Sequence, residues 1–194
     1  MNLYCINHDF LYETEKLLFL FFPFEKNIVL REFCEDEGNY FYTEIKRESS
    51  QVYYKAEFSF NGKKEKAENK KPARLCTDEE YDLLSLAYPL LKSICGFAPK
   101  WGMLTGVRPS KLLLNKMDEI GEDGAVDYFT NRFFVDEKKT ALALSVAKAE
   151  KEIIENSPKN SFSLYISIPF CPTRCSYCSF VSHSIGTDSA KKLL

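Results

Sequence analysis

Three cysteines lie within eight residues of one another: Cys171, Cys175 and Cys178, with the spacing C-x3-C-x2-C. A deprotonated cysteine is a soft ligand that binds zinc and iron–sulfur clusters, and a close cysteine pair can also undergo disulfide exchange. With seven cysteines in 194 residues, chance would produce such a triplet only about 1% of the time. The spacing therefore indicates a metal or redox site.

Three kinds of site compete for these thiols. A structural zinc ion takes four ligands, and His183 is the nearby candidate for the fourth. A thiol–disulfide redox pair needs only Cys175 and Cys178, which leaves Cys171 unexplained. A [4Fe–4S] cluster fits the triplet best, because three thiolates hold three irons and the fourth iron keeps an open position for a reactant.

The residues around the cysteines resemble those of a known enzyme superfamily. The C-x3-C-x2-C spacing, with the aromatic residue Tyr177 before the last cysteine, resembles the signature of the radical S-adenosylmethionine (SAM) enzymes. Within that superfamily, residues 165–180 (YISIPFCPTRCSYCSF) resemble the oxygen-independent coproporphyrinogen III oxidases. Residues 101–112 (WGMLTGVRPSKL) resemble the HemZ branch of this family, which carries an extra N-terminal domain.

The resemblance implies cofactors, partners and a reaction. Cys171, Cys175 and Cys178 would hold a [4Fe–4S] cluster, and SAM would bind the open iron. The implied reaction is the oxidative decarboxylation of propionate side chains of coproporphyrinogen III to vinyl groups, which yields protoporphyrinogen IX in oxygen-independent heme biosynthesis. The implied partners are the porphyrinogen substrate and an electron donor that the sequence does not identify.

Other residues near the cysteines carry further implications of the resemblance. Tyr165, Tyr177 and Phe180 match family positions close to SAM, although such rings could equally pack in a core. Ser167 and Ser179 depart from the family pattern, because better-known members have a histidine and, in some cases, a fourth cysteine there. These departures fit a divergent branch of the family. Two other functions are open besides the oxidase: a heme chaperone that keeps the cysteine motif, and a zinc-stabilised interaction module.

The first part of the chain has the alternating pattern of strands combined with one helical segment. We expect a helix over residues 10–21, ended by Pro23. Residues 61–72 carry five lysines and two glutamates without apolar periodicity, which predicts a solvated loop. Strands are expected over residues 2–8, 28–33, 40–46 and 52–60. The pattern predicts an antiparallel sheet with a helix.

Helical periodicity replaces alternation from about residue 77. Thr77 and Glu80 have the spacing of a capping box, and Pro89 should kink the helix that follows. Arg108 could pair with a substrate propionate or with an acidic neighbour in its own domain. Further helical elements are expected over residues 109–120, 124–133 and 136–156, the last with Leu142, Val146, Ala149 and Ile153 on one side.

These elements predict an α+β N-terminal domain over residues 1–156, a linker over residues 157–162, and the start of a radical SAM (β/α) barrel over residues 163–194. The barrel would begin with a strand over residues 163–168, the cysteine loop, and a helix from Thr187. A complete (β/α)8 barrel takes about 250 residues. We therefore expect this chain to be an N-terminal fragment that is inactive by itself.

Charge and apolar content limit the kinds of partner and the cellular compartment that we expect. The formal net charge is −2, so no strong field attracts nucleic acid or an anionic membrane. The most apolar run, residues 17–24, is far shorter than the ~20 residues of a membrane helix, and no signal peptide precedes it. We therefore expect a cytoplasmic protein whose remaining cysteines are small buried residues: Cys5, Cys34, Cys76 and Cys95.

Overall fold

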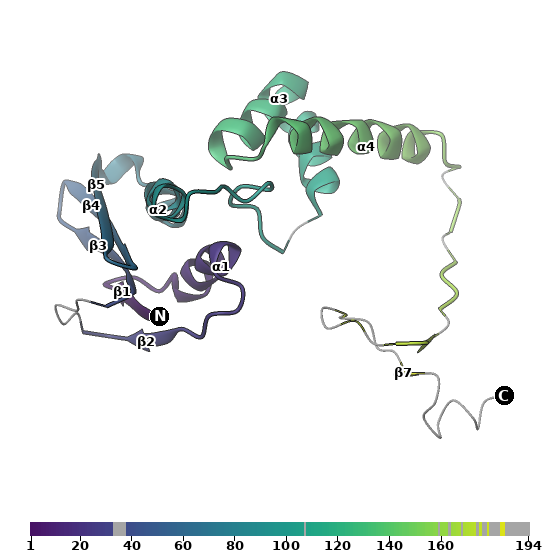
Figure 1. Cartoon of the computed structure of the whole chain (residues 1–194). Helices are drawn as coiled ribbons and strands as arrows, with labels where there is room; N and C mark the ends of the chain where they lie inside the picture. The colour runs from purple at the N-terminus through teal and green to yellow at the C-terminus, as the bar shows by residue number, and fades with distance from the viewer. Residues whose placement is uncertain are drawn as a thin grey trace. The chain divides into compact units, whose positions relative to one another are not determined.

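A computed structural model describes most of the chain (Figure 1). It divides the chain into two units, Met1–Glu155 and Asn156–Leu194. The described residues are 1–32, 38–106, 108–158, 160–162, 164–167, 169–173, 175, 178, 183 and 184.

The first unit is an α+β fold built on a mixed five-stranded sheet with the strand order β2-β1-β3-β4-β5. Strand β1 runs parallel to both of its neighbours, β2 and β3, whereas β3, β4 and β5 are antiparallel. The strands are β1 (Asn2–Ile6), β2 (Ile28–Leu30), β3 (Tyr40–Arg47), β4 (Gln51–Phe60) and β5 (Lys63–Pro72).

The prediction of an antiparallel sheet is therefore wrong for β1. Helix α1 (Leu11–Phe21) connects β1 to β2. A helical crossover of this kind returns the chain in the same direction, so the two strands it joins pair in parallel. Strand alternation in the sequence identifies the strands but carries no information about their direction.

Strand β5 was also predicted incorrectly, as a solvated loop. It pairs with β4 along its whole length, from Phe60↔Lys63 to Gln51↔Pro72. Asn61 and Gly62 both have positive φ, 49° and 77°, as a tight two-residue hairpin requires. An edge strand needs little apolar content, and lysines on an edge prevent further strand pairing, so its composition resembles that of a loop.

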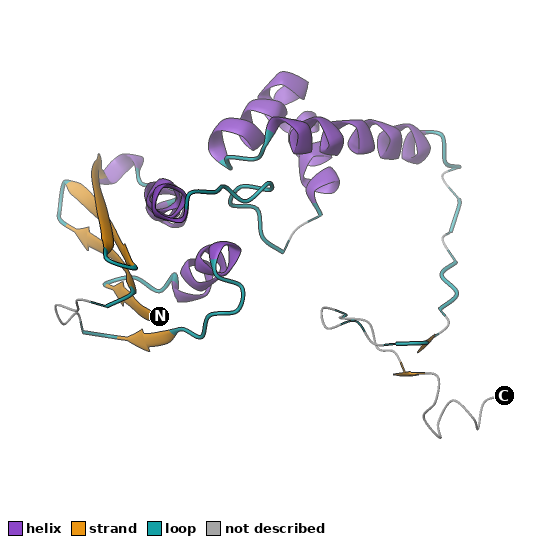
Figure 2. Ribbon diagram, in the orientation of Figure 1, coloured by secondary structure: helices purple, strands orange, loops and turns teal. Residues whose placement is uncertain are grey.

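The main core lies between one face of the sheet and the helices α1 and α2, as Figure 2 shows. Leu3, Phe41 and Phe58 on the sheet are completely buried. They pack in one cluster with Leu18 of α1 and Leu91 of α2. Burying each such side chain contributes about 1.5–3 kcal/mol, so this layer holds the first unit together.

Helix α2 spans Glu79–Cys95 and continues through Pro89. Its N-cap is Asp78, whose side chain accepts a hydrogen bond from the Tyr81 backbone N–H at 3.1 Å, so the capping box predicted from Thr77 is not formed. Gly96 ends the helix in the left-handed conformation with φ of 72°, which glycine adopts at little cost.

A second cluster of buried side chains holds the remaining helices together. Helix α3 spans Pro109–Asp127 with a break at Gly121, the short π-helix η2 spans Tyr128–Arg132, and α4 spans Glu137–Glu155. Leu113 and Phe129 pack there against small residues of α4, Ala143 and Ala147.

The side of α4 that the sequence marks as apolar is not the buried one. Leu142, Val146 and Ile153 are exposed, whereas Ala143 and Ala147 are buried. The small side chains allow α4 to approach α3 closely, and Lys148–Glu122 and Lys151–Asp118 ion pairs join the two helices at 2.7 and 2.8 Å.

The second unit contains one short pairing in its described part. Strand β6 (Phe170–Cys171) is parallel to β7 (His183–Ser184). The strand predicted over residues 163–168 is not formed at residues 164–167, and no strand of the described part of the chain pairs with them. The helix predicted from Thr187 lies outside the described residues.

Candidate cysteine site

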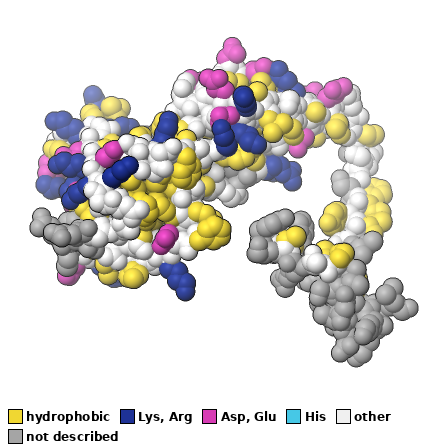
Figure 3. Space-filling view, in the orientation of Figure 1, with side chains coloured by type: hydrophobic (Ala, Val, Ile, Leu, Met, Phe, Trp, Pro, Cys, Tyr) yellow, Lys and Arg dark blue, Asp and Glu magenta, His cyan; other side chains and the backbone are white. Residues whose placement is uncertain are grey.

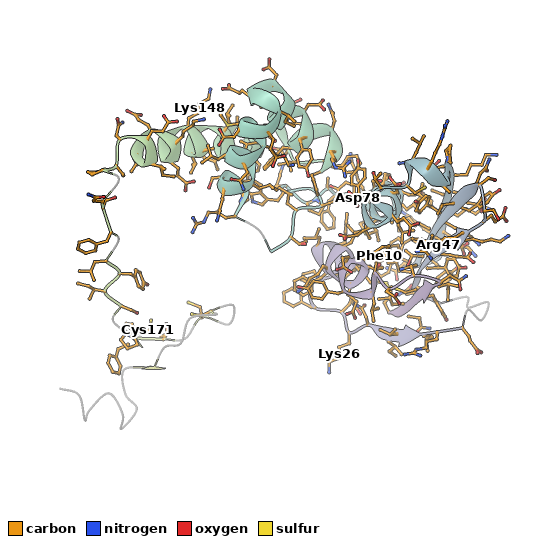
Figure 4. The ribbon with its side chains drawn as sticks, turned by 180° about the vertical axis from the view of Figure 1, so that it is seen from behind. Phe10, Lys26, Arg47, Asp78, Lys148 and Cys171 are labelled. Atoms are coloured by element: carbon orange, nitrogen blue, oxygen red, sulfur yellow. The ribbon has the colours of Figure 1, made fainter. Side chains whose placement is uncertain are left out.

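Strand β6 and the turn after it carry the three predicted ligands. Cys171 ends β6, and Figure 4 labels it on the second unit. Cys178 donates its backbone N–H to the Cys175 carbonyl at 3.1 Å, which closes a turn between the last two cysteines. All three are free thiols; Cys175 is exposed, whereas Cys171 and Cys178 are partly buried.

The structure does not gather the three sulfurs into a ligand set. Within the described residues, no group of three or more His, Cys, Asp or Glu side chains is placed to hold a metal ion. Metal-binding loops commonly acquire their ligand geometry only with the metal, because binding and local folding are coupled. The donor set is therefore chemically suitable, but its geometry is not formed.

The residues expected near SAM are only partly described. Tyr165 is 80% exposed, so its ring does not pack in a core, which was the alternative to a position near SAM. Tyr177 and Phe180 lie outside the described residues, as does Ser179. Ser167 lies on irregular, exposed backbone, and the backbone of His183 pairs with that of Phe170.

The other described cysteines differ from the loop cysteines in their surroundings. Burial raises the pKa of the Cys5 thiol, and it raises that of Cys95 to about 11. A thiol with a raised pKa remains protonated at neutral pH and is a poor ligand. Cys76 is half-buried, with its sulfur 3.4 Å from the Pro72 carbonyl, and Cys34 lies outside the described residues.

The segment 101–112 is a structural joint in the described part of the chain. Gly102 has φ of 57° and packs directly on the backbone of Phe133 and Phe134. The Met103 N–H donates to the Phe133 carbonyl at 2.9 Å. Arg108 is exposed just before α3, and no hydrogen bond or ion pair joins its side chain to another described residue. This segment therefore connects the sheet layer to the helices α3 and α4.

Sequence reasoning missed one cluster at this joint. Arg132 forms an ion pair with Asp78 and lies over the ring of Tyr81, with its guanidinium carbon 3.7 Å from the ring centroid. Arg132 and Asp78 are separated by 54 positions along the chain. Neither helical nor strand periodicity indicates a contact of that range.

Part of the chain is similar in sequence to a known protein. The chain is 33% identical over 105 residues to the oxygen-independent coproporphyrinogen-III oxidase-like protein HemZ of Bacillus subtilis (strain 168). The match covers 53% of this chain and 21% of HemZ, so the chain spans about a fifth of the length of this relative. No family model matches the chain, and no solved structure matches it. The similarity supports the coproporphyrinogen oxidase-like family.

Among the described residues, no helix is both long enough and apolar enough to cross a bilayer.

Proposed function

We propose that this chain carries the cluster-binding segment of a radical SAM enzyme that acts on coproporphyrinogen III in oxygen-independent heme biosynthesis. The observation that carries this proposal is the C-x3-C-x2-C spacing of Cys171, Cys175 and Cys178 in a chain that is 33% identical to HemZ over 105 residues. The name of that relative supports the substrate, and the spacing supports the cofactor.

The cysteines and the neighbouring aromatic residues would have different roles at the site. Cys171, Cys175 and Cys178 would each bind one iron of a [4Fe–4S] cluster. When bound, the cluster with SAM would supply the one-electron chemistry that starts the reaction. Tyr165, Tyr177 and Phe180 would contact the cofactor, orient it, and exclude water from it.

The substrate class determines what the whole protein must provide. Coproporphyrinogen III carries propionate carboxylates, which protein sites bind through charge-assisted hydrogen bonds. The exposed Arg108 is such a donor, since its side chain makes no polar contact with a described residue. An external electron donor completes the list of partners.

A heme chaperone is the second candidate function. The observation that favours it is Ser167, which stands where better-known oxidases have a histidine. Loss of that side chain removes a polar contact near SAM, and a chaperone does not depend on that contact for turnover.

The test uses the intact protein under anaerobic conditions with coproporphyrinogen III, SAM and a chemical reductant. We expect protoporphyrinogen IX and 5′-deoxyadenosine to form, and Cys175→Ala to abolish both products. Stoichiometric heme binding without either product would support the chaperone instead.

A further inference from the structure

A groove lies in the first unit between α1, the start of α2 and the turn at residues 103–105, and we call it the α1–α2 groove. Its volume is about 370 Å³. The floor is apolar and consists of Leu17, Leu84 and Leu104, each at most 8% exposed. Figure 3 shows hydrophobic side chains gathered over α1. A pocket of this volume accommodates a few side chains of a bound segment.

The rim of the groove is acidic. Glu13 of α1 and two residues at the start of α2, Asp78 and Glu80, line it together; Figure 4 labels Asp78 there. Burial raises the pKa of Glu80, and the nearby carboxylates Glu13 and Asp78 raise it further. These carboxylates are therefore close enough to repel one another, and a cation between them would relieve that repulsion.

The chain neutralises this rim only in part. Arg132 pairs with Asp78. Lys16 also lines the groove, but its ammonium lies 5.2 Å from the ring centroid of Tyr12, and no ion pair joins it to a described carboxylate. Glu13 and Glu80 likewise make no ion pair with a described residue. The groove therefore retains unpaired negative charge above an apolar floor.

The aromatic walls suit a cation as well. Tyr12, Tyr81 and Tyr128 line the groove. Arg132 already uses two of these rings, with centroids 3.7 and 5.6 Å from its guanidinium carbon. Lys16 lies over the third ring, Tyr12, which is still 66% exposed, and Lys116 lies over Tyr128 at 4.9 Å. Ring faces attract guanidinium and ammonium groups through their quadrupole, as these contacts within the chain illustrate.

Helix-end electrostatics explain why each acidic residue lies where it does, but they do not explain why the acids line a common groove. Glu13 and Glu80 both lie in the first turn of a helix, where a carboxylate interacts favourably with the macrodipole. That effect requires neither an apolar hollow between two helices nor the convergence of both acids on it. The combination fits a ligand that is cationic and apolar at once.

We propose that the α1–α2 groove is a docking site for a short basic amphipathic segment of a partner protein. An apolar side chain of the segment occupies the floor, and a neighbouring lysine or arginine pairs with Glu13 and Glu80. The site lies in the first unit and uses none of the three loop cysteines, so it does not depend on the proposed function.

The probe is a displayed library of random twelve-residue peptides selected on the 194-residue chain. We expect the enriched peptides to carry lysine or arginine within four positions of leucine or an aromatic residue, as one helix face allows. The double variant Glu13→Gln/Glu80→Gln should weaken a synthetic enriched peptide about tenfold, since two charge pairs are lost.

Two further variants separate charge from shape. Thr105→Trp fills the groove from an exposed position and should abolish peptide binding without changing charge. Glu150→Gln/Glu152→Gln removes the same charge from α4 and should leave binding unchanged. Enrichment of acidic or uncharged peptides would overturn the proposal, as would equal binding by all variants. A dimer of the chain that dissociates in Glu13→Gln/Glu80→Gln would assign the groove to a second copy and overturn it too.

Discussion

The guanidinium of Arg132 lies over the ring of Tyr81, with its carbon 3.7 Å from the ring centroid, and the same group forms an ion pair with Asp78. Asp78 is the N-cap of α2, and Arg132 is the last residue of the short π-helix η2, which precedes α4. The contact thus fastens the helical part of the first unit to the start of α2.

Replacing Arg132 with Lys should destabilise the first unit by about 1 kcal/mol, and Arg132→Ala by about 2 kcal/mol. Lysine keeps the charge but loses the planar stacking on Tyr81, whereas alanine removes both interactions. Urea unfolding followed by circular dichroism measures the difference. Equal stability of the wild type and Arg132→Ala would show that the contact contributes nothing.

Gly102 should tolerate no side chain. A Cβ atom there would lie 1.9 Å from the Phe133 carbonyl oxygen, and φ is 57°. Gly102→Ala must therefore displace backbone and should cost about 3 kcal/mol or more.

Gly106 provides the matched control for this glycine. Its φ is 65°, but no atom lies within 4 Å of the position that a Cβ atom would take. Gly106→Ala should cost only about 1 kcal/mol from the left-handed backbone. Thermal unfolding of the two variants gives the comparison, and equal melting temperatures would contradict the close contact at Gly102.

Stability should fall as the pH drops below about 6.5, the ordinary pKa of histidine. Burial lowers the pKa of His8, and the nearby Arg47 lowers it further, against the raising effect of Thr43 and Asp9. Its Nδ1 accepts the Phe10 N–H at 3.2 Å. Below about pH 6.5, His8 is protonated in the unfolded chain but remains neutral in the folded chain. The free energy of unfolding therefore decreases with falling pH until the pH passes the lower pKa of His8 in the folded chain.

The chain offers a control for this pH dependence, because it has two histidines. His8→Asn should flatten the decrease in unfolding free energy between about pH 7.5 and pH 5.5, while His183→Asn should leave it unchanged. Urea titrations across this range measure the slope. An unchanged slope in His8→Asn would exclude His8 as its source.

The alternation in residues 40–46 and 52–60 was enough to predict β3 and β4. The sequence did not show that β3 is buried on both faces, with Tyr40 and Tyr42 on one side and Phe41 and Ile45 on the other. Helical spacing likewise predicted α1 and α2. Strand β5 escaped prediction because an exposed edge strand has no apolar face to reveal. The parallel pairing of β1 escaped because strand direction depends on the path of the chain and not on local composition.

At the candidate sites, too, local features could be predicted from the sequence and long-range contacts could not. The spacing of Cys171, Cys175 and Cys178 is local and was visible in the sequence. The contact between Arg132 and Asp78 joins residues 54 positions apart. The α1–α2 groove requires α1, α2, α3, η2 and residues 103–105 to meet. The N-cap of α2 was missed by one residue, because Thr77 and Asp78 are both good caps and tertiary packing decides between them.

The proposed [4Fe–4S] site is tested most directly by the iron and acid-labile sulfide content of the chain after anaerobic reconstitution with iron and sulfide. We predict about four irons and four sulfides per chain. Single replacement of Cys171, Cys175 or Cys178 by alanine should lose them, while Cys76→Ala should retain them. Stoichiometric zinc without sulfide, or a full cluster in Cys175→Ala, would contradict the assignment.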